Sequence, residues 1–479
     1  MTSLLGTDGY KLSMAEAGYP LRRETFYYTH RRGGAQVWPF DAQALVASLV
    51  PTATDDELGR LAKLGYPVGE GVRAAFREGA FEGRLLRRIE VRSLPKGAWF
   101  LPGEPVLSIT APSALASWLE PRLLMASWAS QIATLAKTAP ADLAEHLAVV
   151  PTESDRERVR ALLDELGVPC PPIEARPDAI RDGARRRAAE LVACVGDASR
   201  IFEVGLRAAV SIEHHRLVLE GCREAGVTRT SHVALAEELG LIAVGTMGHE
   251  HVQRFGSDEA AFRAMKERRS NRSSFLLDTF DTLRSGLPAA LRVMAEDPGG
   301  GDSVRYDSGD KEAQLREAHA RSTAQGLSPV HVLEDGFDRE MTIQFERVRE
   351  ELGIPRERLF YGYGGFLVGR RALSRDAVAA VYKVSQSGTM PVMKFSDDAG
   401  KRSIPGEPVV FRRVKGDGPD GLIGQHGEAP PAGYVLATGA VDVPRPSVPP
   451  GAVAPSAASA ALVARCEARR KSLLEQGEP

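Results

Sequence analysis

The sequence has few cysteines, no long hydrophobic run and no excess of charge of either sign. Its four cysteines lie far apart and form no C-x-x-C pair, which argues against a disulfide scaffold or a zinc site and favours reduced thiols in a cytoplasmic protein. No apolar run approaches the roughly 18 residues of a membrane helix. The first ten residues lack a basic segment followed by an apolar one, so no signal peptide is expected.

Charge is nearly balanced, with 61 Lys and Arg against 63 Asp and Glu, a formal net charge of −2. This balance argues against nucleic acid or a membrane surface as a partner bound through bulk charge, but it allows a local anion site. Hydrophobic residues make up 43% and aromatic residues 6% of the chain, which is ordinary for a soluble globular protein.

The length of 479 residues predicts two to four domains, at about 100–200 residues per domain. Changes in composition divide the chain into three parts, 1–135, 136–375 and 376–479. The middle part begins with a Pro-, Ala- and Arg-rich stretch at about 138–198, which we interpret as a helical insertion. The last part holds the predicted strands Ala380–Val384, Val392–Lys394 and Val409–Arg413, then a Pro/Ala-rich linker at Pro444–Ala458 and a terminal helix at Leu462–Gln476.

From about Arg200, short apolar runs alternate with amphipathic helical patterns, as expected of βα units. The predicted strands are Arg200–Val204, Leu241–Gly245, Ser274–Thr279, Ser303–Asp307, Pro329–Glu334 and Arg358–Gly362. The predicted helices are Ala208–Ala225, Asp258–Arg268, Thr282–Ala295, Lys311–Gln325 and Asp338–Leu352. Repeated βα units predict an α/β fold with a largely parallel sheet, open or closed.

Polar residues follow these apolar runs at once, at the positions that become the carboxyl ends of the strands. They are Thr246, Gly248 and His249; Asp278 and Asp281; Asp307 and Asp310; Glu334 and Asp335; and Gly362, Gly364 and Gly365. Because active sites of parallel α/β proteins lie at this edge, the pattern predicts a functional site there.

Two acidic segments stand out, around Asp278 and Asp307. Carboxylates at strand ends can accept ribose hydroxyls or hold the waters of a Mg²⁺ ion. Asp281 and Asp310 each precede a predicted helix, so helix capping explains them equally well. Arg305 lies two residues before Asp307 and points to the same side of its strand, where it can bind a carboxylate or phosphate or form a structural salt bridge.

Glycine turns follow the last two predicted strands, at Gly336 and at Gly364–Gly365. Glycine lets backbone N–H groups approach an anion closely, and turns in these places form phosphate sites in barrels. The sequence has no G-x-x-x-x-G-K-[ST] motif, so a P-loop is not expected.

Two histidines, His249 and His251, follow the Gly245-Thr246 turn. A metal hydrolase would need further ligands, and the later histidines are scattered. A nucleophilic role needs only one imidazole, because phosphohistidine is a covalent intermediate. A capping or core histidine is the third interpretation.

In order along the chain, these segments resemble the nicotinate phosphoribosyltransferase family. The resemblance spans about residues 5–410, and the ordered series is highly specific. Its motifs are Thr7-Asp8-Gly-Tyr10-Lys11-Leu-Ser-Met14, Tyr28-Thr-His-Arg31-Arg32, Pro102-Gly-Glu104-Pro-Val106, Leu119-Glu120, Phe202-Glu203-Val-Gly205-Leu-Arg207, Thr230-Ser231, Gly245-Thr246-Met-Gly-His249, Asp278-Thr-Phe-Asp281-Thr, Arg305-Tyr-Asp307-Ser-Gly-Asp310, Gly362–Gly365, Val381-Tyr-Lys383, Lys394-Phe-Ser396 and Ile404-Pro-Gly406.

The resemblance implies an irregular α/β barrel beside a smaller α+β domain formed from both chain ends, and a homodimer. It implies that nicotinate and 5-phosphoribosyl 1-diphosphate are joined to nicotinate mononucleotide, with ATP as co-substrate and Mg²⁺ as cofactor. In the implied roles, His249 is phosphorylated by ATP, and Asp278 and Asp307 hold ribose and the Mg²⁺-diphosphate. The implied substrate and phosphate contacts are Tyr10, Arg207, Thr246, Arg305, Gly336, Gly364 and Gly365.

The sequence departs from the family pattern at Ala208, His232 and Glu250 and in the length of 138–198. The nearest rival is nicotinamide phosphoribosyltransferase, but the F-E-x-G and G-T-M-x-H forms favour nicotinate. Other rivals are a metal-dependent barrel hydrolase using His249 and His251, a non-catalytic sensor of phosphoribosyl diphosphate, and a helical interaction protein.

Overall fold

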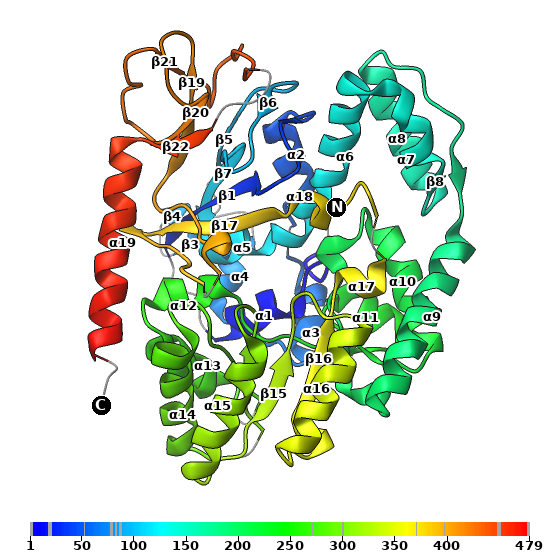
Figure 1. The fold of residues 1–479 in the computed structure, drawn as a ribbon, viewed down its shortest axis with the longest axis vertical. Helices are drawn as coiled ribbons and strands as arrows, with labels where there is room; N and C mark the ends of the chain where they lie inside the picture. Colours follow the sequence, from blue (N-terminus) through cyan, green and yellow to red (C-terminus); the bar gives the residue numbers. More distant parts are fainter. Residues whose placement is uncertain are drawn as a thin grey trace.

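The structure is a computed structural model, which describes residues 3–17, 22–51, 53–76, 80–81, 84–85, 89–270, 272–298, 301–369, 371–396, 398–447 and 452–476. A parallel sheet and an antiparallel sheet form its two main layers, with helices around them (Figure 1). All four cysteines are free thiols. No helix within the described ranges is long and apolar enough to cross a membrane.

The parallel sheet has seven strands in the order β12-β11-β10-β16-β15-β14-β13. Its strands are β10 (Ile201–Glu203), β11 (Arg229–Thr230), β12 (Ile242–Ala243), β13 (Ser274–Leu276), β14 (Ser303–Tyr306), β15 (Val330–Leu333) and β16 (Leu359–Tyr363). All neighbouring strands are parallel. The predicted α/β class with an irregular barrel is confirmed, although edge strands β12 and β13 do not pair with each other in the described residues, so the sheet is a half-barrel.

The helices around these strands are α10 (Ile212–Glu224), α11 (Val233–Leu239), α12 (His249–Phe255), α13 (Asp258–Arg268), α14 (Leu287–Glu296), α15 (Lys311–Ala324), α16 (Arg339–Glu351) and α17 (Gly365–Val368). Five of them, α10, α13, α14, α15 and α16, were predicted, and the short helices α11, α12 and α17 were not. The Asp310 side chain accepts a hydrogen bond from Ala313 N at 3.0 Å, and Asp281 accepts one from Arg284 N at 3.0 Å. Both aspartates therefore cap helices, which was one of the two interpretations.

The antiparallel sheet combines both ends of the chain. Its order is β18-β17-β1-β7-β5, with β1 (Arg23–His30), β5 (Glu90–Ser93), β7 (Leu107–Pro112), β17 (Ala380–Ser387) and β18 (Met390–Pro391). Phe26 of β1 is paired with Val384 on one side and Ile109 on the other. Because a strand from after residue 375 pairs with a strand from before residue 31, the two chain ends share one core.

The amino-terminal part adds short helices and strands around this sheet. The helices are α1 (Gly9–Glu16), α2 (Ala42–Leu49), α3 (Asp55–Lys63), α4 (Glu70–Phe76), α5 (Ser113–Trp118) and α6 (Glu120–Thr138). The strands are β2 (Gln36–Val37), β3 (Ala80–Phe81), β4 (Arg84–Leu85) and β6 (Trp99–Phe100).

The stretch 138–198 holds three helices and two short strands. They are α7 (Leu143–Leu147), α8 (Glu153–Glu165), α9 (Pro177–Val195), β8 (Val149–Val150) and β9 (Glu174–Ala175). Leu143, Val159 and Leu163 form a separate small core with Trp128 of α6. Helix α9 lies directly against α10, where a Cβ at Gly221 would stand 2.2 Å from Arg181 O. Only glycine allows this close approach of the two backbones.

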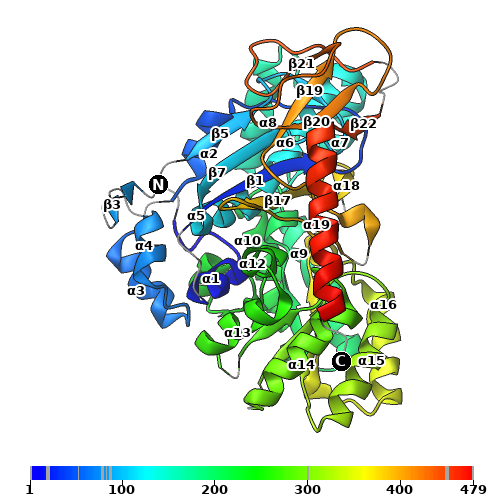
Figure 2. The same ribbon diagram turned by 90° about the vertical axis from the view of Figure 1, so that its left-hand side faces the viewer.

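After β18 the chain forms a four-stranded sheet and a long last helix (Figure 2). The elements are β19 (Pro408–Arg413), β20 (Gly421–Gln425), β21 (Tyr434–Leu436), β22 (Val453–Pro455) and α19 (Ala457–Gln476). The predicted strand at Val392–Lys394 is wrong, because these residues form an irregular loop. The predicted linker Pro444–Ala458 contains β22, which pairs with β20, while its residues 448–451 lie outside the described ranges.

Asp258, at the start of α13, makes the stability of this fold depend on pH. It is 2% exposed, and burial raises its pKa to about 7. Between about pH 4 and pH 7 the folded chain therefore holds a proton that the unfolded chain has lost, and stability falls as pH rises, by up to about 1.4 kcal/mol per pH unit. We expect Asp258→Asn, which stays neutral, to remove this decline.

Urea unfolding at several pH values measures this effect. Asp178→Asn is the matched control, because the Asp178 side chain is 80% exposed. Parallel stability curves for the wild type and Asp258→Asn would contradict the prediction.

Candidate active site

A cavity of about 500 Å³ lies at the carboxyl ends of the parallel strands and is bounded on the other side by β17. It extends along the strands as far as Ser274 and Ser303, the first residues of β13 and β14. Six carboxylates and ten basic side chains line it, the latter being Arg31, Arg207, Arg229, Arg269, Arg272, Arg305, Arg375, Lys383, Lys394 and Lys401. The excess of positive charge suits anionic ligands.

His249 begins α12 and lies on the wall of this cavity, 7% exposed. Its Nε2 lies 2.6 Å from Lys394 Nζ, 3.3 Å from Asp307 Oδ2 and 3.6 Å from Asp278 Oδ1. Lys394 Nζ is also 3.2 Å from Asp278 Oδ2 and 3.5 Å from Asp307 Oδ2. One ammonium group thus lies between an imidazole and two carboxylates.

The contacts of His249 define which ring nitrogen can react. An ammonium group is only a donor, so Lys394 Nζ donates to Nε2, and the ring proton belongs on Nδ1, 3.1 Å from Thr279 Oγ1. Burial, followed by the positive charge of Lys394, lowers the pKa of His249 to about 4. The imidazole is therefore neutral at pH 7, with its lone pair on Nε2.

Lys394 also sets the charge state of the two aspartates. Burial alone would raise their pKa values, but His249, which is protonated at the acid pH where the aspartates titrate, and then Lys394 lower the pKa of Asp278 below its ordinary value. Lys394 lowers the pKa of Asp307 well below its ordinary value. Both carboxylates are consequently ionised at pH 7.

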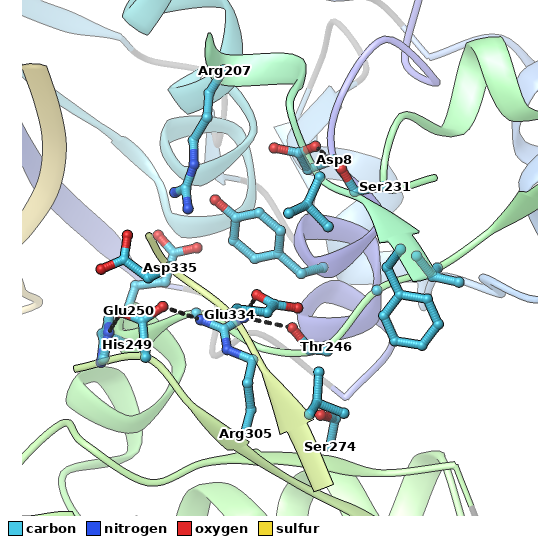
Figure 3. Close-up of a pocket in the computed structure, with 18 of the residues that line it drawn as sticks. Asp8, Arg207, Ser231, Thr246, His249, Glu250, Ser274, Arg305, Glu334 and Asp335 are labelled. Carbon is cyan, nitrogen blue, oxygen red and sulfur yellow. Dashed lines mark hydrogen bonds and ion pairs between the residues drawn. The ribbon is translucent and has the colours of Figure 1, made fainter. Parts of the chain in front are cut away.

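Arg305, on β14, connects the carboxylates of two neighbouring strand ends (Figure 3). Its Nη2 is 3.1 Å from Asp307 Oδ1, and its Nη1 is 3.4 Å from Glu334 Oε2. Nη1 also donates to Thr246 Oγ1 at 2.7 Å. The structural salt bridge that the sequence left as an alternative is therefore present, and the same guanidinium lines the cavity.

The amino-terminal helix α1 supplies Tyr10 to the same cavity. Tyr10 Oη donates to Glu120 Oε2 at 2.7 Å, and Arg207 Nη1 lies 3.7 Å from Glu120 Oε1. A Cβ at Gly245 would be 2.4 Å from Gly9 C, so the two backbones are in direct contact here. Figure 3 shows Arg207 and Arg305 entering the cavity from opposite sides of the view.

Six of the ten residues predicted for the site line the cavity: Tyr10, Arg207, Thr246, His249, Arg305 and Asp307. Asp278 lies behind His249 and Lys394 and is 1% exposed. Among the described lining residues none of the three predicted glycines, Gly336, Gly364 and Gly365, is present, although Asp335 beside Gly336 is.

The second histidine of the H-x-H pair is a core residue. His251 is fully buried, and its Nε2 lies 3.1 Å from Ala261 O, within hydrogen-bonding distance. The two side chains of His249 and His251 therefore belong to different environments, which removes the ligand pair that a metal hydrolase would need.

Lys394, Lys383 and Glu120 lie within the motifs of the family resemblance, but no role was predicted for them. Lys394 contacts three of the predicted groups, and burial lowers the pKa of the cavity residue Lys383 to about 7. Glu120 accepts hydrogen bonds from both Tyr10 and Lys11. The sequence signal that could have indicated a role for these three residues was their place in the motifs of the family resemblance. No local pattern indicates which strand end each side chain faces.

Together, fold and site define an α/β half-barrel protein with a cationic cavity at the carboxyl ends of its strands. A scan against models of known families finds no match. The nicotinate phosphoribosyltransferase of Bacillus subtilis (strain 168) is 30% identical over 241 residues, which cover 48% of this chain and 46% of that protein. The Homo sapiens protein of that name is 24% identical over 388 residues, which cover 69% of this chain and 61% of that protein. The chain thus spans about half the length of the bacterial relative.

Solved structures share the fold. A Saccharomyces cerevisiae protein provisionally named a nicotinate phosphoribosyltransferase has a TM-score of 0.60 at 18% identity, covering 84% of this chain and 95% of that one. The nicotinate phosphoribosyltransferase of Porphyromonas gingivalis has a TM-score of 0.57 at 19% identity, covering 84% and 96%. At 18% and 19% identity, these structures show that the chain shares the fold of those proteins.

Proposed function

We propose that this protein is a nicotinate phosphoribosyltransferase of NAD salvage. It joins nicotinate to 5-phosphoribosyl 1-diphosphate and releases nicotinate mononucleotide and diphosphate. The observation that carries the proposal is one cationic cavity holding a neutral His249, an ionised Asp307 and the guanidinium of Arg305. Relatives of the same name support the same reaction.

The charges in the cavity suit this reaction. The bond from ribosyl C1 to the diphosphate oxygen breaks with its electron pair on diphosphate, and the pyridine nitrogen of nicotinate supplies the pair for the new bond to C1. C1 becomes oxocarbenium-like in between. The Asp307 carboxylate stabilises this positive charge, and arginines such as Arg305 and Arg207 stabilise the anionic leaving group or the nicotinate carboxylate.

ATP coupling through His249 is the second part of the proposal. Nε2 attacks the γ-phosphorus of ATP and ADP leaves, and water later releases phosphate from the phosphohistidine. The phosphoryl group adds about two negative charges, which the adjacent Lys394 ammonium offsets. The low pKa of His249 supports this step, because Nε2 itself carries no proton and only the hydrogen bond from Lys394 must break before attack.

Mg²⁺ is the cofactor that the resemblance implies, and the oxygen donors of Asp278 and Asp307 fit it. Asp278 Oδ1 is a buried atom that accepts no hydrogen bond from the described residues. Bound with diphosphate, the ion would neutralise charge on the leaving group. The homodimer and the cytoplasmic location implied by the sequence stay predictions.

The metal-hydrolase alternative is disfavoured by Lys394. His249, Asp278 and Asp307 have the geometry of a three-ligand metal site, but the Lys394 ammonium group already lies within 3.5 Å of all three. This resident positive charge opposes a divalent ion held by these three side chains alone, whereas Mg²⁺ would bind together with the diphosphate, whose negative charges offset the repulsion.

The deciding experiment incubates the purified protein with nicotinate, phosphoribosyl diphosphate, Mg²⁺ and ATP and separates the products by chromatography. We expect nicotinate mononucleotide, with kcat/KM for nicotinamide lower by at least about tenfold because the cationic cavity favours the carboxylate. Equal use of nicotinamide would indicate the sister activity. Binding of phosphoribosyl diphosphate without product from either base would favour the sensor alternative.

A further inference from the structure

The last helix, α19, reaches from the four-stranded sheet to the region of α14 (Figure 2). Its start is attached to that sheet by the hydrogen bond from Ser456 N to Ile423 O, 2.9 Å long. Its far end carries Arg470, which contacts the barrel. The helix lies beyond about residue 410, where the family resemblance in the sequence ends, so no motif assigned it a role.

Arg470 touches two separate loops at once. Its Nε donates to Phe280 O at 2.8 Å, and its Nη2 is 3.3 Å from Asp281 Oδ2. Its guanidinium carbon lies 5.3 Å from the ring centre of Phe395, a cation–π distance. A planar guanidinium can make all three contacts together, because its donors point in fixed directions and its face can stack on a ring. An ammonium group is a compact point charge without this geometry.

The two loops that Arg470 joins carry the groups around His249. Asp278 and Thr279 directly precede Phe280, and Lys394 directly precedes Phe395. The loops also touch each other, because Phe395 N donates to Thr279 O at 3.1 Å. A shift between them would change the distances from Lys394 to Asp278 and to His249.

The conformation of the second loop needs such support. Ser396 has φ = 58°, a left-handed conformation that costs a non-glycine residue energy. Its Oγ lies 2.9 Å from Ser308 Oγ, and Ser308 in turn donates to Asp278. The loop is thus held by a serine bridge on the cavity side and by Arg470 on the outer side.

We propose that Arg470 is a positioning residue for the proposed phosphoribosyl transfer. Through Phe280 and Phe395 it holds the Asp278 and Lys394 loops at the separation that places the Lys394 ammonium between His249 and the carboxylates. The inference rests on the proposed function, and it assigns a role in turnover to a helix outside the cavity.

The test compares Arg470→Gln with Lys471→Gln, which removes the same charge from a side chain that is 79% exposed. For Arg470→Gln we expect kcat to fall about 10- to 100-fold with KM for nicotinate changed less than about twofold, because the reacting groups are misplaced while the pocket remains. Lys471→Gln keeps wild-type kinetics. Guanidinium ion added to Arg470→Ala restores part of kcat, which it would not do after a general loss of structure.

An unchanged kcat in Arg470→Gln overturns the proposal. A loss of activity in Arg470→Ala that added guanidinium ion does not restore overturns it as well. Hydrogen exchange of the Phe395 backbone amide tests the positioning role independently of whether the protein makes mononucleotide. If the wild type makes no mononucleotide, the reaction proposal fails, and the Phe395 amide still reports on the contact between the loops. Faster exchange of that amide in Arg470→Gln than in Lys471→Gln supports the positioning role, and equal exchange overturns it.

Discussion

Replacing His249 with alanine is expected to lower the rate of the proposed ATP hydrolysis by about 1,000-fold or more. His249 presents the only lone pair in the His249–Lys394–aspartate cluster that is both neutral and nucleophilic at pH 7, since Asp278 and Asp307 are ionised carboxylates and Lys394 donates to Nε2. Phosphate release measured beside mononucleotide formation gives both rates in one sample.

A second measurement is the acid-labile phosphoryl label that the protein retains after incubation with ATP labelled at the γ-phosphate. The wild type and the control His146→Ala, an exposed site on α7, retain the label, and His249→Ala does not. Full ATP coupling in His249→Ala would refute the phosphohistidine. Mononucleotide formation that persists without ATP stimulation would agree with it, because the carboxylates and arginines of the transfer step remain.

The second large effect is expected for Lys394→Met. The variant keeps the length of the side chain but leaves Asp278, 1% exposed, and the Asp307 side chain, 15% exposed, without their ammonium partner. Removing one partner of a buried ion pair costs about 3–5 kcal/mol of unfolding free energy. Activity is lost as well, because the charge that offsets a phosphoryl group on His249 is gone.

Denaturant unfolding at pH 7 measures the stability change. The control is Lys401→Met, whose salt bridge with Asp335 is more exposed, with side chains 29% and 46% accessible, and is expected to contribute at most about 1 kcal/mol. The double variant Lys394→Met/Asp278→Asn should recover part of the loss, because it removes the more deeply buried carboxylate, whereas Asp307 keeps its salt bridge with Arg305. Equal stabilities of the two single lysine variants would contradict this account.

Part of the site was predictable from local pattern. A carboxylate placed directly after an apolar run lies at the end of a strand, and parallel strands end at the same edge, so His249, Arg305 and Asp307 were expected near one another. The helix caps Asp281 and Asp310 followed from their position before amphipathic stretches. The glycine turns were equally visible, but local pattern did not show that Gly364 and Gly365 lie outside the cavity lining of the described residues.

Other features had no local signal. The two-residue strand β11, Arg229–Thr230, carries no apolar run, and Lys394 lies in a loop that was predicted as a strand. Tyr10 reaches the cavity because the backbones of Gly9 and Gly245 meet, which depends on packing between segments far apart in the chain.

The sequence by itself determined the α/β class, six of the seven strands of the parallel sheet and the residues that stand at their ends, because these depend on hydrophobic periodicity along a few neighbouring residues. Only the tertiary structure decided that the sheet stays open, that Lys394 neutralises the carboxylates beside His249, and that α19 braces their loops. The contacts of Lys394 and Arg470 join barrel loops to residues that follow the barrel in the chain, and their formation depends on how whole layers pack rather than on any local pattern.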